Sequence, residues 1–244
     1  RKLQSQLGLA EPEVQAFLSS LGPPRSISDG HDLAREGPSP GVLTILLQGL
    51  ACRYKDLADG RRQILCFQLP GDIVDIHGFV MGRLDHAIGA LTACQVATVP
   101  YEAVNALVER HPALRMALWR ESMLDAAICR EWEVNLGQRG AYERMAHLLC
   151  EVVLRQKIAG LENNGRYALP LTQSELSDAL GLSVVHVNRV LQRLRKEGLI
   201  TLRAGYLTVH DMAGLTAAGG FEPSYLHPGE ASPPGFSRSS PENA

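Results

Sequence analysis

The chain has 244 residues, of which 45% are hydrophobic, and its formal net charge is −2 at neutral pH. This length and apolar content suffice for one large or two ordinary domains with real cores, and the near-neutral charge excludes a generally basic, histone-like protein. No apolar run approaches the length of a membrane span, and residues 1–10 lack the apolar segment of a signal peptide.

The cysteines are spread singly along the chain, at Cys52, Cys66, Cys94, Cys129 and Cys150. An odd number without any C-x-x-C pair argues against a disulfide framework and against a zinc or iron–sulfur cluster built on neighbouring cysteines. We therefore expect a reducing, cytoplasmic location and no membrane partner.

Residues 1–24 are predicted to be a helical segment that closes at Pro23–Pro24. In residues 25–100 the pattern changes to short strand-like runs separated by glycine-marked turns, and Asp59–Gly60 gives a strong hairpin signal between two of these runs. Many short strands with such turns predict an antiparallel sandwich or barrel.

Residues 101–137 have helical periodicity and are predicted to form a long dimerisation helix. At about 100° per residue, one apolar line comprises Met116, Met123, Ala127 and Val134. The opposite line comprises Leu114, Leu118, Ile128 and Trp132. Two opposed stripes need two partners, so we expect the helix to lie between its own barrel and a second copy. The alternative is a helix buried within one chain. The predicted dimer contacts are Leu114, Leu118, Met123, Ala127, Ile128 and Trp132.

Residues 138–212 contain ten Lys or Arg against seven Asp or Glu, whereas the remainder of the chain is acidic. This asymmetry suits a DNA-binding domain carried by a regulatory domain, although ordinary scatter of charge is the alternative. A helix over 141–158, two short helices within 171–200 and a hairpin over 199–209 are expected here. Residues 213–244 are rich in Gly, Pro and Ser and are predicted to be a mostly disordered tail.

The stretch Leu171–Ile200 has the sequence form of a DNA-binding helix-turn-helix. Thr172 and Glu175 form a capping box, Gly181 suits the bend, and Ser183 can cap the second helix. The buried stripe of that second helix is predicted to be Val187, Val190, Leu191 and Leu194. Two packed helices with a solvated basic face are the alternative, but capping, turn glycine and following hairpin together favour DNA binding.

The exposed face of the second helix has side chains suited to base edges, because Arg pairs with guanine and Asn or Gln with adenine. The predicted base contacts are Val184, Val185, Asn188 and Arg189. Later basic residues of such helices usually meet phosphates, so Arg193 is a phosphate candidate, with Arg195 or Lys196 as further ones. Backbone-phosphate contacts are also predicted for Thr172, Gln173, Ser183 and His186.

Over nearly all of residues 25–212 the sequence resembles the Crp/Fnr superfamily of bacterial transcription regulators. The most specific parts are the helix-turn-helix stretch 171–194 and the phrases Arg35-Glu36-Gly37, Leu47-Gln48-Gly49 and Leu69-Pro70-Gly71-Asp72-Ile73. The resemblance implies an α+β protein with an N-terminal antiparallel β-roll of the cyclic-nucleotide-binding type, a long dimerisation helix and a C-terminal winged helix-turn-helix. It also implies a homodimer that binds a palindromic operator in double-stranded DNA, with RNA polymerase as a further partner.

One position departs from the family pattern. Many members carry a Glu four positions before the base-contacting Arg, where this chain has Val185. A valine offers only an apolar contact, for example to a thymine methyl group. The half-site is therefore expected to differ from the family's commonest one.

The resemblance places the effector-pocket candidates at Gly71, Asp72, Ile73, Asp85 and His86. Cyclic-AMP binders of the family carry a Glu and an Arg-Ser or Arg-Thr pair in this cassette. Here Asp85–His86 stands near that pair's position, and a carboxylate there opposes a phosphate, so cyclic AMP is not expected. Residues 1–51 lack the cysteine cluster of the oxygen-sensing branch, so an iron–sulfur cluster is not expected either. No cofactor is predicted, and the effector stays unidentified or absent.

Two alternatives remain beside this prediction. His77 and His86 are candidate haem or metal ligands of a haem- or small-molecule-sensing regulator, although structural histidines are commoner. Cys129 is a candidate redox switch, although a buried inert thiol is commoner. A cupin-like barrel enzyme would need a clustered His-x-His with a carboxylate, which His31, His77 and His86 do not provide. We therefore predict no enzyme, no catalytic residue and no metal site.

Overall fold

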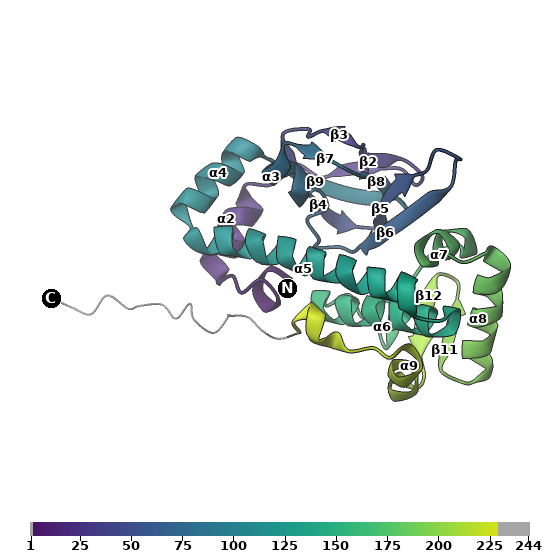
Figure 1. The fold of residues 1–244 in the computed structure, drawn as a ribbon. Helices are drawn as coiled ribbons and strands as arrows, with labels where there is room; N and C mark the ends of the chain where they lie inside the picture. The colour runs from purple at the N-terminus through teal and green to yellow at the C-terminus, as the bar shows by residue number, and fades with distance from the viewer. Residues whose placement is uncertain (1, 229–244) are drawn as a thin grey trace.

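The N-terminal domain is a β-roll in a computed structural model that describes residues 2–228 (Figure 1). Its strands are β1 (Arg25–Ile27), β2 (Asp32–Ala34), β3 (Gly37–Pro38), β4 (Val42–Gln48), β5 (Ala51–Asp56), β6 (Arg62–Gln68), β7 (Arg83–Leu84), β8 (Ala87–Ala90) and β9 (Cys94–Pro100). They pair antiparallel in sheets ordered β1-β9-β4 and β2-β8-β5-β6, and β3 pairs with β7. Helix α3 (Ile76–Met81) lies between β6 and β7 in the chain.

Apolar side chains close the roll. Leu46, Ile88 and Val96 come from three different strands and are buried together between the sheets. The Asp59–Gly60 hairpin joins β5 to β6, with Gly60 at φ +84°, in the left-handed region that glycine adopts without strain. The predicted α+β class and antiparallel β-roll are confirmed.

Four helices of the described chain lie along the roll. They are α1 (Lys2–Ser5), α2 (Glu11–Ser19), α4 (Tyr101–Arg110) and α5 (Pro112–Gln138). The expected single helix over 101–137 is wrong, because the chain breaks at His111, where φ is −130° and ψ is 84°. Pro112 disfavours helical geometry for the residue before it, so α4 ends and α5 starts afresh with proline in its first turn.

The C-terminal domain follows α5. It comprises α6 (Ala141–Ala159), β10 (Arg166–Ala168), α7 (Gln173–Leu180), α8 (Val184–Lys196), β11 (Ile200–Arg203) and β12 (Tyr206–Val209). The strands form a small sheet ordered β10-β12-β11. Helix α5 lies between this domain and the roll (Figure 1), and α7 contacts β6 directly through an Arg62 Nε to Asp178 Oδ2 ion pair of 3.1 Å.

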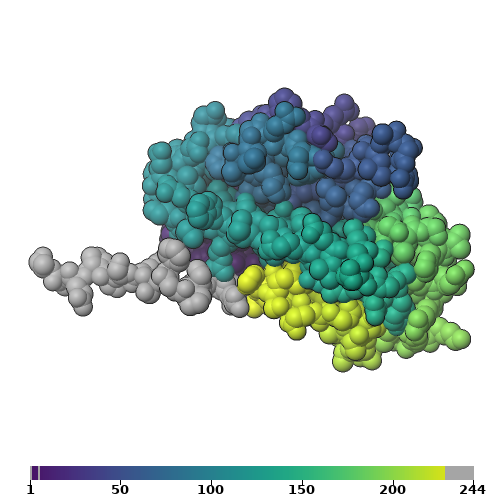
Figure 2. All heavy atoms as spheres, in the orientation of Figure 1, coloured from purple at the N-terminus to yellow at the C-terminus, as the bar shows by residue number. Residues whose placement is uncertain are grey.

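Residues 212–228 correct the prediction of a disordered tail. They form α9 (Met212–Gly219) and a 3₁₀ turn, η1 (Pro223–Leu226), which lie against α5 and α6 (Figures 1 and 2). Leu215, Phe221 and Leu226 are buried there. The glycines that suggested disorder instead allow close packing, since a Cβ on Gly219 would lie 2.5 Å from the His147 backbone nitrogen. The rest of the predicted tail, 229–244, lies outside the described residues.

Candidate nucleic-acid interface

Helix α7 begins with the predicted capping box. Glu175 N–H donates to Thr172 Oγ1 at 3.1 Å, and the Glu175 carboxylate accepts from Thr172 N–H at 2.6 Å. Gly181 then ends the helix at φ +60°, and the Ser183 hydroxyl accepts from His186 N–H at the start of α8. Each end of the turn is thus set by a side chain or by glycine's conformational freedom, and the local sequence alone predicted it.

Helix α8 divides into an inner and an outer face. The four residues of the predicted inner stripe, Val187, Val190, Leu191 and Leu194, are all buried. On the outer face Val184, Val185 and Arg189 are exposed, with Val185 at 69% the most open of the valines named for base contact. The predicted base contacts Val184, Val185, Asn188 and Arg189 therefore lie together on one accessible face.

These side chains line a shallow surface recess together with Gln173 and Gln192. Asn188 Nδ2 donates to Gln173 Oε1 at 3.4 Å, which links the recognition helix to the first turn of α7. The recess has a valine end and an amide–guanidinium end. Such a surface can accept a thymine methyl group beside hydrogen-bonding base edges.

Arg193 has partners within its own chain. Its Nε lies 2.8 Å from Glu197 Oε1, and its guanidinium lies 3.9 Å from the centre of the Tyr142 ring, whose hydroxyl donates to Glu197. The predicted phosphate role of Arg193 therefore competes with an existing ion pair. Thr172, Ser183 and His186 remain exposed at the predicted phosphate-facing edge.

The β11–β12 hairpin adds residues that the sequence did not indicate. Arg203 and Tyr206 are exposed on either side of its turn, and Arg166 on β10 stacks over Tyr206 at 4.5 Å from the ring centre. Ala204 at φ +51° and Gly205 at φ +75° make the turn. The only sequence signal was an Arg and a Tyr flanking Ala204–Gly205, which is also common in ordinary hairpins.

The predicted dimer contacts need correction, because some of them are buried within their own chain and others are exposed. Leu114, Ile128 and Trp132 are buried within their own chain, so they cannot lie in an interface with a second copy. The ring of Trp132, for example, packs edge-on against Phe67 of the roll with 5.7 Å between ring centres. Leu118 is half-buried against the helices near α4.

The opposite face of α5 is open. Trp119 is 66% exposed and Met123 65%, and Val134 continues the same face towards the C-terminal domain. Ala127, also a predicted contact, is buried at the edge of this face. Trp119 stands four residues before Met123 on this face, but it lies off the apolar line that starts at Met116, so that line did not predict it.

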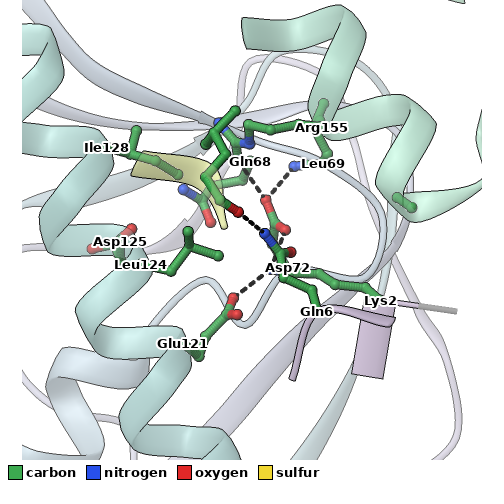
Figure 3. A pocket seen from close by; sticks show the side chains of 12 residues that line it. Lys2, Gln6, Gln68, Leu69, Asp72, Glu121, Leu124, Asp125, Ile128 and Arg155 are labelled. Carbon is green, nitrogen blue, oxygen red and sulfur yellow. Dashed lines mark hydrogen bonds and ion pairs between the residues drawn. The ribbon is translucent and has the colours of Figure 1, made fainter. Parts of the chain in front are cut away.

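The five predicted effector-pocket residues lie in different surroundings. Asp72 lies in a buried ion cluster between the two domains (Figure 3), and Ile73 packs in the core beside Leu43. The Asp85 side chain is 83% exposed, and its carboxylate meets Nδ1 of the buried His86 at 2.7 Å. Gly71 is the turn glycine before Asp72, at φ +96°. These five residues therefore do not line a common pocket.

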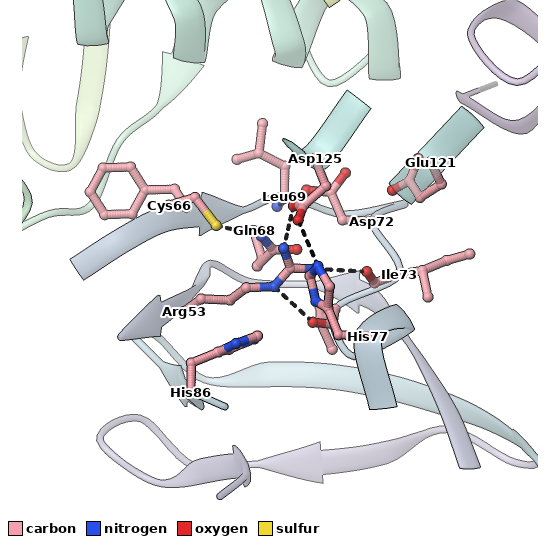
Figure 4. A network of polar contacts seen from close by, with 12 residues as sticks. Arg53, Cys66, Gln68, Leu69, Asp72, Ile73, His77, His86, Glu121 and Asp125 are labelled. Atoms are coloured by element: carbon pink, nitrogen blue, oxygen red, sulfur yellow. Dashed lines mark hydrogen bonds and ion pairs between the residues drawn. The ribbon is translucent and has the colours of Figure 1, made fainter. Parts of the chain in front are cut away.

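The interior of the roll holds a second polar cluster (Figure 4). The buried Arg53 donates to the carbonyls of Ile73 and Val74 and pairs with Asp125 on α5. Burial opposes ionisation of Asp125, but Arg53 and His77 outweigh it and hold the pKa of this carboxyl well below its usual range. The cluster therefore ties the roll to α5.

His77 and His86 differ in their partners. His77 Nε2 lies 3.2 Å from Asp125 Oδ2, and the two histidine rings meet edge to face with 5.4 Å between centres. Burial and Arg53 lower the pKa of His86. Among the described residues no group of three or more His, Cys, Asp or Glu has the arrangement of a metal site. The Cys129 thiol is half-buried, and burial raises its pKa to about 12, which disfavours the reactive thiolate.

Within residues 2–228 no helix is long and apolar enough to cross a membrane. Two family models match the chain, a cyclic nucleotide-binding domain over residues 24–111 and a Crp-like helix-turn-helix domain over residues 143–218. The boundary between the two matches falls within α5 and the first residues of α6, where the structure also changes domain.

Known proteins resemble the whole arrangement. The nitrogen fixation regulation protein FixK of Bradyrhizobium diazoefficiens is 32% identical over 176 residues, which cover 70% of this chain and 71% of FixK. The transcriptional activator protein FnrL of Cereibacter sphaeroides is 29% identical over 215 residues, 86% of each chain. The structure of FixK2 from Bradyrhizobium japonicum matches 80% of this chain and 96% of its own, with a TM-score of 0.70 and 24% identity, and supports the same fold.

Proposed function

The chain belongs to the Crp/Fnr family of transcription regulators, and we propose that it acts as a homodimer whose two α8 helices contact the two halves of a palindromic operator. Members of this family bind DNA through the helix-turn-helix and are not enzymes, so the cupin-like enzyme is rejected. We propose three further points: which residues contact bases, that two copies pair, and that RNA polymerase is a partner.

The outer face of α8 carries this proposal. Val184, Val185 and Arg189 stand exposed, and Asn188 is half-buried beside them, on a helix whose other face is packed. The helix can therefore enter a major groove without rearranging its core. Arg189 would pair with a guanine, while Val185 would meet a thymine methyl. The phosphate contacts that we propose on the small C-terminal sheet are Arg203 on β11 and the stacked Arg166–Tyr206 pair on β10 and β12.

The open face of α5 supports pairing with a second copy. Trp119 and Met123 are large apolar side chains left in solvent on a helix that is packed on its other side. A two-fold axis through this face would set two α8 helices side by side, and half-sites one helical turn apart, about 34 Å, would then mirror the protein.

The purified protein first selects a duplex with two inverted half-sites from a random library. The test then compares its affinity for this palindrome with its affinity for a duplex that keeps only one half-site. We expect two chains per palindrome, much tighter binding to the palindrome than to the half-site, and a steep loss of affinity with salt. Equal binding to both duplexes, or one chain per palindrome, would reject the paired arrangement.

We further propose that the protein works in the cytoplasm, contacts RNA polymerase and carries no resident cofactor. FnrL is a transcriptional activator, and the same role for this chain is tested by transcription in vitro from a promoter with the selected palindrome. Visible absorption and native mass spectrometry of the purified protein test the cofactor. A Soret band or an added mass would favour the haem- or small-molecule-sensing alternative.

A further inference from the structure

Four parts of the fold meet at one buried point, the turn between β6 and α3. Asp72 lies at the centre of this turn, Arg155 reaches it from the last third of α6, Lys2 from α1, and Glu121 from α5 (Figure 3). The side chains of all four are 10% exposed or less. The roll, the N-terminal segment, the dimerisation helix and the DNA-binding domain are thus joined through charged groups.

Each oxygen of the Asp72 carboxylate has its own partners. Oδ1 accepts from Lys2 Nζ at 2.7 Å, and Oδ2 accepts from Arg155 at 2.9 Å and from Leu69 N–H at 2.8 Å. Lys2 Nζ also donates to Glu121 Oε1 at 2.6 Å. Burial alone would favour the neutral acid, but Lys2 and Arg155 hold the pKa of Asp72 below its usual value. The carboxylate is therefore charged and fully engaged.

Arg155 joins the two domains at a fixed geometry. The same guanidinium nitrogen that pairs with Asp72 also donates to the Phe67 carbonyl at 2.9 Å, and the other terminal nitrogen lies 3.4 Å from Glu151 Oε1 one turn earlier on α6. Glu151 in turn accepts from Trp132 on α5 and from Tyr225 on η1. A planar guanidinium can meet the oxygens of Asp72, Phe67 and Glu151 in one orientation only. It can therefore fix the angle between the roll and the DNA-binding domain.

Helix α6 transmits that orientation to the base-contacting face. It is a single helix from Ala141 to Ala159, it contacts α8, and it carries Met145, Leu148 and Leu149 in the core shared with the buried stripe of α8. On the other side of the turn, the carbonyls of Ile73 and Val74 accept from Arg53, which pairs with Asp125 of α5 (Figure 4). Residues 72–74 are thus linked through Arg155 to α6, and through α6 to α8.

Resting on the proposed function, we propose that Asp72 and Arg155 are positioning residues, which fix the angle of the DNA-binding domain to the dimerisation helix so that both α8 helices reach a palindrome at once. The recess on α8 is lined by helix-turn-helix residues alone. In the orientation that the Asp72–Arg155 ion pair stabilises, the base-contacting face of α8 is therefore accessible to DNA. A buried ion pair adds little net stability compared with an apolar pair of the same shape, but it strongly penalises geometries that leave one charge alone. A buried ion pair is therefore suited to fixing the orientation of one domain relative to another.

The test compares Arg155→Met with the wild type on the selected palindrome and on its single half-site. A domain that folds but is wrongly angled still binds one half-site, so half-site affinity should stay at the wild-type value. Affinity for the palindrome should fall about tenfold or more, in the usual range for coupling between domains. The salt dependence of palindrome binding should fall towards that of the single half-site, because only one α8 helix then meets phosphates.

Two further variants and one control keep the test decisive. Asp72→Asn combined with Arg155→Met removes both charges, so thermal stability should recover towards the wild type while palindrome affinity stays low. If Arg155→Met fails to fold, Arg155→Lys keeps the charge but not the planar fork, and it should show the same selective loss. Arg35→Met removes an arginine from an exposed ion pair of the roll and should change neither affinity.

Palindrome affinity that is unchanged or raised in a folded Arg155 variant would overturn the inference. So would an equal loss on palindrome and half-site, which indicates damage within the DNA-binding domain. A wild-type protein that does not prefer the palindrome to the half-site would instead contradict the proposed function.

Discussion

In the proposed complex, Arg189 and Val185 are expected to determine which bases α8 can distinguish. Arg189 stands exposed on the outer face and has the donors that match guanine. We expect Arg189→Ala to weaken binding to the selected palindrome by roughly 1–3 kcal/mol per half-site and to relax preference at one base pair. Competition binding against duplexes with single base changes measures both.

Lys196→Ala is the matched control, since Lys196 is exposed near the other end of the same helix. It should weaken all duplexes alike and reduce the salt slope by about one. Unchanged selectivity in Arg189→Ala would remove Arg189 from the base contacts.

His147 gives a residue-scale prediction on pH. It lies on α6 against the rings of Phe221 and Tyr225, and its Nε2 is 3.2 Å from Glu131 Oε1 without hydrogen-bond geometry. Burial and Arg139 lower the pKa of His147 to about 4, against the opposing effect of Glu131. The unfolded chain, with its histidine pKa near 6.5, therefore binds a proton that the folded chain excludes between these values.

The stability contribution of neutral His147 is present above pH 6.5 and is lost as pH falls towards 4, with a total of about 3 kcal/mol. Asp75 acts in the opposite direction, because burial raises its pKa to about 6. The measurement is therefore the difference in unfolding free energy between the wild type and His147→Gln at several pH values. That difference should shrink on acidification, and a constant difference would contradict the prediction.

At the scale of single elements, the two faces of α5 differ in burial. The face with Leu114, Ile128 and Trp132 is packed in the chain, and the face with Trp119 and Met123 is open. An exposed tryptophan in such a place is suited to be an interface hot spot, which is worth about 2 kcal/mol or more, roughly thirtyfold in affinity. Trp119→Asp should therefore shift the protein from dimer to monomer in sedimentation experiments.

Leu18→Asp is the matched control, because Leu18 is an exposed apolar residue on a different helix, α2. It should leave the dimer intact. A Trp119→Asp protein that sediments as the wild type does would exclude this face of α5 as the interface.

Element positions were largely predictable from sequence, but element faces were not. Periodicity located the helical character of α5 and the inner stripe of α8, because those patterns are local. It could not decide which of two apolar lines on α5 faces its own chain, since that depends on Phe67 and on α6, which are distant in sequence. The composition of residues 213–228 misled for the same reason, because Gly219 serves a close contact with α6 and not flexibility.

At the scale of the whole molecule, the sequence and the family resemblance predicted the two domains and the helix between them, but not what joins them. Asp72 was expected to face an effector. It instead pairs with Arg155, 83 positions away, and with Lys2, 70 positions away. No local pattern reports ion pairs over such separations. The capped helix-turn-helix was predictable in detail because its capping contacts span only three residues.

We propose above all that two copies of this chain recognise a palindrome through α8. Genome-wide DNA occupancy of the wild type, with the Arg189→Ala variant in parallel, tests it most directly. Wild-type peaks should be centred on one inverted repeat with half-sites about one helical turn apart, and the variant should lose those peaks. Wild-type peaks without an inverted repeat, or peaks that persist unchanged in the variant, would contradict it.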